Sequence, residues 1–196
     1  ARAENAVAFI SNVHNGCQFR VLGAMSEKSA KQGHTYSASL SYNKKPLDFY
    51  LGYAQIESSK TSNGKAEAYV TGGSYDFDKF KVYTGYTVEK NSCRSCTGSL
   101  KMGSGIKDKG ASEFHLINLG VRIPHGKATW IAQGVRILDK SDYAVGLGSR
   151  HSNWFAVGME YRISKRTLFY SSIGTLDNKN GSSYGLGTGT SSATAG

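Results

Sequence analysis

Apolar and polar residues alternate along most of the chain with the period of two that is typical of β-strands. Between Tyr36 and Tyr42, for example, tyrosine, alanine and leucine occupy one side of the predicted strand and serine occupies the other. Ten segments show this alternation and are predicted strands: Glu4–Ser11, Cys17–Met25, Tyr36–Tyr42, Leu47–Ile56, Ala66–Phe77, Phe80–Val88, Phe114–Ile123, Ala128–Leu138, Trp154–Ile163 and Thr167–Leu176. The pattern predicts an all-β protein.

The connections between these segments alternate between short and long. The short ones have the Asn, Asp, Gly and Pro content of hairpin turns and lie at Asn12–Gly16, Asn43–Pro46, Asp78–Lys79, Pro124–Lys127 and Ser164–Arg166. The long ones are rich in Ser, Gly and Lys and lie at 26–35, 57–65, 89–113, 139–153 and from 177 onward. An antiparallel sheet with this order has every short turn at one end, which is the layout of an outer-membrane β-barrel.

Alternation alone does not show which face is apolar: a soluble barrel has its apolar residues inside, and a membrane barrel has them outside. Aromatic residues near the predicted strand ends favour the membrane, where they form interfacial girdles. They are Tyr36, Tyr42, Tyr53, Tyr75, Phe77, Tyr86, Trp130, Trp154, Phe155, Tyr161 and Phe169. We therefore predict an antiparallel up-and-down transmembrane β-barrel; the alternative is a soluble ligand-binding β-barrel of lipocalin type.

Composition narrows the choice of function. The chain has no apolar run near the roughly 20 residues that a membrane-spanning helix needs. Its 24 basic and 14 acidic residues give a net charge of +10, which fits an anionic solute, anionic lipid or nucleic acid. Because many of the lysines fall in the polar connections, a solvated surface explains much of this charge. A basic nucleic-acid-binding protein is the least supported reading, since no basic strand face carries interleaved aromatics.

Several motifs resemble those of Gram-negative general porins of the betaproteobacterial type. The segment Glu160–Tyr170, followed by Leu176-Asp177-Asn178 and Tyr184–Gly187, is similar to their near-C-terminal hairpin. Further similarity lies in the entry Arg2–Val7, in the strand Tyr36–Tyr42 with Asn43 and Pro46, and in Gly72–Phe77.

This resemblance implies a passive diffusion channel for small hydrophilic or anionic solutes in the bacterial outer membrane, with no enzymatic activity and no cofactor. Such porins are homotrimers of 16-stranded barrels in contact with outer-membrane lipid and lipopolysaccharide, and their third loop constricts the channel. Residues 1–196 are then expected to be a single barrel domain that is incomplete at both ends. The constriction loop and first strands are expected before residue 1, and the last strand after residue 196.

A porin selects solutes by the charges around its water-filled lumen. The resemblance makes Arg2 the best candidate for the constriction, since it matches a wall arginine just after the constriction loop. Extending the alternation inward adds other candidates, because an Arg or Lys on the lipid face costs about 2–4 kcal/mol at the membrane midplane. The pore-lining candidates are Arg2, Glu4, Gln18, Arg20, Lys81, Asn118, Arg122, Arg136, Glu160 and Arg162.

The cysteines and histidines do not indicate a catalytic or metal centre. Cys93 and Cys96 form a C-x-x-C in the longest connection, where a small surface disulfide is the favoured interpretation, and Cys17 is expected to be structural. The histidines, at 14, 34, 115, 125 and 151, lack metal-ligand spacing. No nucleic-acid partner, metal or cofactor is expected.

Overall fold

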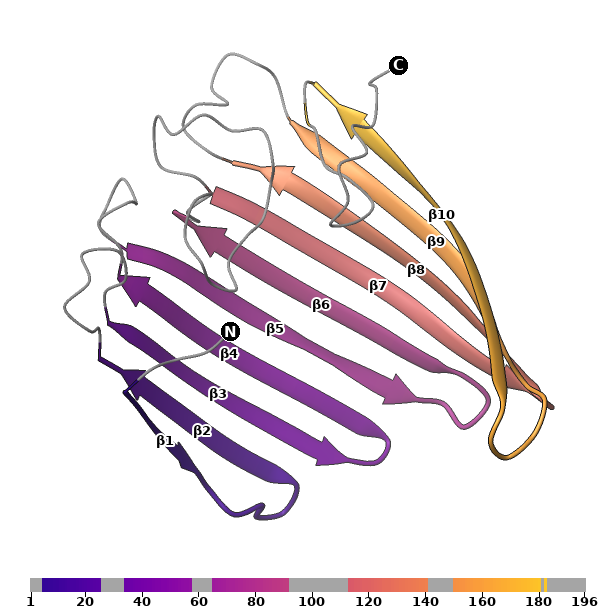
Figure 1. Ribbon diagram of the computed structural model, residues 1–196, viewed down its shortest axis with the longest axis horizontal. Helices are drawn as coiled ribbons and strands as arrows, with labels where there is room; N and C mark the ends of the chain where they lie inside the picture. Colours follow the sequence, from indigo (N-terminus) through magenta and orange to yellow (C-terminus); the bar gives the residue numbers. More distant parts are fainter. Residues whose placement is uncertain are drawn as a thin grey trace.

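The computed structural model describes residues 5–25, 34–57, 65–91, 113–140, 150–180 and 182. Ten antiparallel strands form one sheet in chain order, each paired with its neighbours in sequence (Figure 1). They are β1 (Ala6–Ile10), β2 (Cys17–Ala24), β3 (Thr35–Lys44), β4 (Leu47–Glu57), β5 (Lys65–Asp76), β6 (Lys81–Lys90), β7 (Glu113–His125), β8 (Ala128–Asp139), β9 (His151–Arg162) and β10 (Leu168–Lys179). All ten predicted strands are confirmed, with ends shifted by a few residues.

The five short connections lie together along one end of the sheet, at the lower right of Figure 1. We call this the turn end and the opposite one the far end. Residues that tolerate a positive φ allow the tight turns: Asn15 and Gly16 have φ of 49° and 87°, and Asp78 has 66°. The turn between β7 and β8 is shorter than predicted, because Pro124 pairs with Thr129 inside the ladder.

The strand register divides the side chains between two faces, since directly paired residues in an antiparallel ladder point to the same side. We call the face that carries Arg20, Asp48 and Arg122 the inner face and the opposite one the outer face. Every buried residue of the described strands belongs to the inner face, from Ala24 on β2 to Phe114 on β7 and Ser152 on β9. Curvature of the sheet toward this face brings its side chains together and buries them.

The outer face is apolar through the middle of the strands and widely exposed. Leu119, Phe155 and Ile173 are 61%, 53% and 73% exposed. Charged residues on this face lie only near the strand ends, such as Lys65 and Glu67 at the far end. An apolar surface of this extent requires a partner or a lipid environment. The arrangement is the reverse of a soluble barrel, so the structure resolves the ambiguity that alternation leaves open.

Aromatic residues form two bands on the outer face. At the turn end the rings of Tyr75 and Phe77 lie 4.6 Å apart, and those of Phe77 and Phe80 are stacked at 4.8 Å. At the far end the rings of Tyr53 and Tyr69 lie 4.9 Å apart. These bands occupy the places expected of interfacial girdles. The inclusion of Trp154 among the girdle residues was wrong.

Trp154 pairs with Val135 and Leu176, and this register places it on the inner face. The sequence shows that an aromatic residue lies near a strand end, but the strand register determines whether its side chain is on the inner or the outer face. In the described part of the chain, no helix is long and apolar enough to cross a membrane.

Candidate functional site on the inner face

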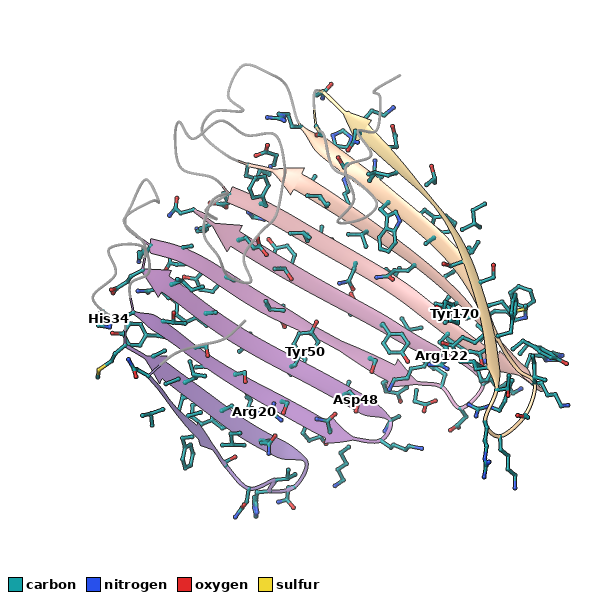
Figure 2. All side chains as sticks on the ribbon, viewed as in Figure 1. Arg20, His34, Asp48, Tyr50, Arg122 and Tyr170 are labelled. Carbon is teal, nitrogen blue, oxygen red and sulfur yellow. The ribbon has the colours of Figure 1, made fainter. Side chains whose placement is uncertain are left out.

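The register places five charged candidates on the inner face: Arg20, Lys81, Arg122, Glu160 and Arg162. Arg20, Asp48 and Arg122 follow one another across the turn-end half of the sheet (Figure 2). The polar candidates Gln18 and Asn118 share this face. Arg2, Glu4, Cys93 and Cys96 lie outside the described residues.

The prediction that Arg136 lines the pore was wrong. Arg136 pairs with Ile117 on β7 and Asn153 on β9, and both belong to the outer face. It lies only three residues from Asp139, which ends β8 at the far end of the sheet. The cost of a lipid-facing charge falls to about 0–1 kcal/mol near the membrane interface, so the midplane value does not apply to this position.

A charged cluster joins three strands at the turn end of the inner face. Lys81 on β6 reaches across β5, and its Nζ lies 2.7 Å from Oδ2 of Asp48 on β4. The hydroxyl of Ser74, on the intervening β5, donates to the same carboxylate oxygen at 3.1 Å. The Lys81 ammonium also lies 5.4 Å from the centre of the Tyr83 ring. Lys81 is therefore compensated within the wall.

A second ion pair lies further along the wall and also spans one intervening strand. Arg122 on β7 and Glu160 on β9 approach to 2.7 Å between Nη2 and Oε2, over the intervening β8. Their side chains are 47% and 31% exposed. Like the Lys81–Asp48 pair, this one places a base and an acid together on a solvent-accessible wall.

Arg20 differs from the other bases, because no carboxylate of the described residues pairs with it. Its Nε and Nη2 donate to Oε1 of Gln18 at 3.1 and 2.6 Å. Gln18 in turn donates from Nε2 to the carbonyl oxygen of Ser11. The guanidinium is therefore held by a neutral partner, and no carboxylate of the described residues offsets its charge.

Paired glycines allow two polar side chains to lie flat against the wall. Gly72 on β5 and Gly85 on β6 are directly paired. A Cβ atom on Gly72 would lie 2.6 Å from the hydroxyl of Tyr50, and one on Gly85 would lie 2.7 Å from Nδ2 of Asn118. The missing side chains make room for Tyr50 and Asn118 along the sheet.

Sequence reasoning missed the acids of this face. Asp48, Asp76, Glu89 and Asp139 share it with the bases by register. Asp48 follows the alternation of its strand and could have been found from it, whereas Glu89 and Asp139 lie where the sequence predicts connections. Glu89 is 6% exposed, and its Oε2 accepts no hydrogen bond from the described residues.

These acids change the charge balance of the wall. The inner face carries acids as well as bases, so the net charge of +10 does not describe it. Among the described residues, no group of His, Cys, Asp or Glu is arranged to hold a metal ion. Cys17 has a free, exposed thiol at the start of β2.

Comparison with known proteins gives a consistent result. A family model described as Gram-negative porin matches residues 1–181. OmpF of Salmonella typhi, in complex with daunomycin, superposes with a TM-score of 0.69 at 13% identity, covering 90% of this chain and 56% of OmpF. OmpT of Vibrio cholerae gives 0.67 at 12% identity, with coverages of 88% and 54%. A porin refined at 1.8 Å gives 0.63 at 12% identity, with coverages of 88% and 55%.

The chain spans about half the length of the solved porins that it matches. A comparison with curated protein sequences gives no match. At these identities the structural similarity establishes the shared fold, an outer-membrane β-barrel.

Proposed function

Because the chain belongs to the Gram-negative porin family, we propose that it forms the wall of a water-filled channel for passive diffusion of small hydrophilic solutes. Its location is the bacterial outer membrane. The observation that carries the proposal is the division of the sheet into an exposed apolar outer face and an inner face with charged and hydroxyl residues. The 196 residues are proposed to contribute to a single, larger barrel domain, since related structures are about twice as long.

Passage through such a wall requires no chemical step. Solutes are selected by the width of the lumen and by fixed charges around it. The neighbouring bases Lys81 and Arg122 each have an acid on the side away from the other base, Asp48 and Glu160, so this part of the wall carries both signs and interacts with polar solutes without strongly retaining either ion. Fixed ion pairs also keep the long basic side chains against the sheet, where they leave the lumen open.

We further propose a preference for anions that depends on the uncompensated base Arg20, together with Arg2. Arg20 has only a neutral hydrogen-bond partner, so its potential extends into the lumen. Lys81 and Arg122 contribute less, because each has a carboxylate within 2.7 Å. Glu4 and Arg162 are proposed as further lumen charges, and Cys93 and Cys96 as a surface disulfide.

The outer face is the proposed contact with partners. A homotrimer is proposed from the family, and lipid is proposed to cover the rest of this face. At the far end Lys65 pairs with Glu67 and Lys90 with Glu113. Among the described residues, no acid forms an ion pair with Arg136. It is suited to the phosphates of lipid headgroups, including those of lipopolysaccharide.

Conductance tests this proposal directly. The full-length protein, reconstituted into planar bilayers, is expected to produce stepwise KCl conductance that persists without any added energy source. A correctly folded oligomer that does not conduct would overturn the channel proposal. Reversal potentials in a KCl gradient then test anion preference separately.

A further inference from the structure

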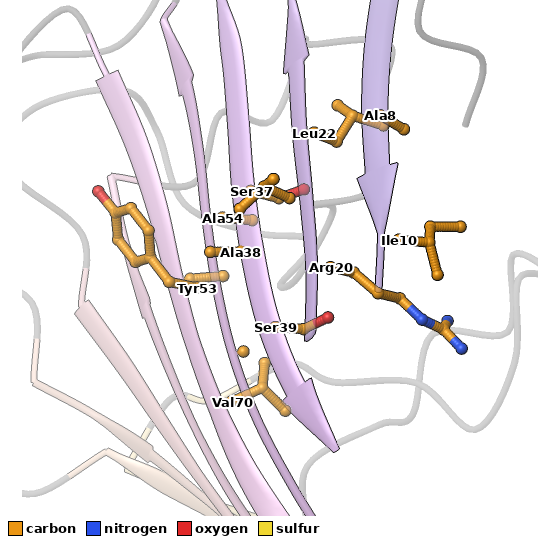
Figure 3. A pocket seen from close by; sticks show the side chains of 13 residues that line it. Ala8, Ile10, Arg20, Leu22, Ser37, Ala38, Ser39, Tyr53, Ala54 and Val70 are labelled. Atoms are coloured by element: carbon orange, nitrogen blue, oxygen red, sulfur yellow. The ribbon is translucent and has the colours of Figure 1, made fainter. Parts of the chain in front are cut away.

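The inner face has a hollow of about 330 Å³ over β1 to β5 (Figure 3). Two adjacent cross-strand rows form its floor. One contains Ala8, Leu22, Ser37, Ala54 and Ala68, and the other contains Ile10, Arg20, Ser39, Gly52 and Val70. The volume lies within the range of small-molecule binding sites.

The hollow exists because the side chains at its centre are small. Ser37, Ser39, Gly52 and Ala54 occupy the middle strands, and the larger Leu22 and Val70 stand on either side of them. Most of the surface that it offers is therefore hydrocarbon, which is unusual for a wall that faces water. Two serine hydroxyls add polar groups.

One charged side chain lines this apolar surface. Figure 3 shows Arg20 beside Ile10 on the β1–β2 side of the hollow, with Val70 on the side of β5. Gln18 occupies the Nε and Nη2 atoms of the guanidinium, which leaves further N–H donors of its fork for a ligand. The Arg20 row continues through Val70 to Thr87, and among the described residues it contains no acid. The adjacent row reaches an acid only at Glu89 on β6, about 19 Å from β2 at about 4.8 Å per strand.

We propose that this hollow is a subsite for small organic carboxylates that carry an apolar ring or chain. The carboxylate binds the Arg20 guanidinium, and the apolar part extends over Ser39 toward Ala54. Both features are needed: a purely hydrophilic anion gains nothing from the apolar floor, and an uncharged apolar solute gains nothing from Arg20. The inference rests on the proposed channel, since it names a class of solutes that this wall retains during passage.

Benzoate is a suitable probe, with acetate and benzyl alcohol as references that each lack one feature. Full-length protein is studied in planar bilayers at 0.1 M KCl, where electrostatic screening is moderate. Benzoate is expected to reduce the KCl current in a concentration-dependent manner, and acetate or benzyl alcohol to do so far less. Binding is measured independently by saturation-transfer NMR on the detergent-solubilised protein.

Two variants locate the subsite. Ala54→Phe fills the hollow and is expected to abolish benzoate block and the NMR signal. Arg20→Gln keeps the hollow and is expected to raise the half-blocking concentration about three- to tenfold, as for loss of one exposed charge-assisted hydrogen bond. Ser172→Phe is the matched control, because Ser172 is exposed on the inner face of β10, away from the hollow. It adds the same ring and should keep benzoate block.

The outcomes separate this inference from the channel proposal. Conductance without benzoate block or NMR binding overturns the subsite and leaves the porin intact. Equal block in wild type and Ala54→Phe also overturns it. A folded protein that does not conduct overturns the channel proposal, and the NMR comparison of wild type with Ala54→Phe then decides the subsite alone.

Discussion

Arg122 and Glu160 form an ion pair of 2.7 Å across β8, joining β7 to β9 on the inner face. Because both side chains are partly exposed, the pair contributes at most about 1 kcal/mol to stability. Its larger effect is on the electrostatic potential of the wall, because the potentials of the two opposite charges largely cancel at the position of an ion in the lumen.

Neutralising one member of this pair should shift ion selectivity. Glu160→Gln leaves Arg122 uncompensated and is expected to raise anion over cation permeability, whereas Arg122→Gln should lower it. Reversal potentials in a KCl gradient measure both, and the double variant should return close to wild type. Shifts of the same sign in the two single variants would contradict the pairing.

The Lys81–Asp48 pair makes a parallel prediction. Asp48→Asn removes the carboxylate that Lys81 contacts at 2.7 Å, so the ammonium becomes a lumen charge and anion permeability should rise. The shift should shrink in 1 M salt, where the screening length is about 3 Å. Ser74→Ala, which removes only a hydroxyl donor to Asp48, should leave the reversal potential unchanged.

Arginines introduced at two neighbouring positions test the division of faces. Leu119 is the middle residue of the 13-residue β7 and points outward, whereas Asn118 points inward. Leu119→Arg should lower the free energy of unfolding by about 2–4 kcal/mol in lipid vesicles. Asn118→Arg should change stability much less and reduce conductance. Urea unfolding followed by tryptophan fluorescence, with single-channel recording, measures both.

Replacing native arginines tests the corrected position of Arg136. Arg20→Leu removes an inner-face charge and should lower anion over cation permeability. Arg136→Leu removes an outer-face charge and should leave the reversal potential unaltered. If both replacements shift the reversal potential by a comparable amount, Arg136 lines the lumen and its assignment to the outer face is wrong.

The glycine pair predicts a packing effect. Gly72→Ala places a Cβ 2.7 Å from the backbone oxygen of Thr84 and 2.6 Å from the Tyr50 hydroxyl. The backbone oxygen cannot rotate away, so the free energy of unfolding should fall by about 1–3 kcal/mol. Gly23→Ala is the control, since a Cβ there has no atom within 4 Å. If urea unfolding shows the same decrease in the free energy of unfolding for Gly72→Ala and Gly23→Ala, the crowding at Gly72 is refuted.

The strands were predictable because each one repeats a local signal. Alternation identified all ten, and Asn, Asp and Gly marked the hairpins. The strand ends were less certain, because charged residues such as Lys65 and Glu113 continue the ladder after the apolar pattern stops.

The site was only partly predictable, because it depends on pairing between strands. The ion pairs Lys81–Asp48 and Arg122–Glu160 each skip a strand, so sequence distance gives no sign of them. Arg136 was assigned to the wrong face for a related reason. The high cost of a lipid-facing arginine holds at the membrane midplane, and the sequence prediction did not consider that Arg136 lies near the end of its strand. The hollow beside Arg20 depends on small residues from several strands, and no single segment reveals it.

The two-faced register also determines which insertions and deletions the protein tolerates. Removing one residue from the middle of β7 would reverse every later position of that strand up to its turn, and Arg122 would point into the hydrocarbon while Val121 entered the water. Removing two residues would keep each side chain on its own face. Within strands, length changes by even numbers are therefore the conservative ones, a parity constraint that does not apply to the connections.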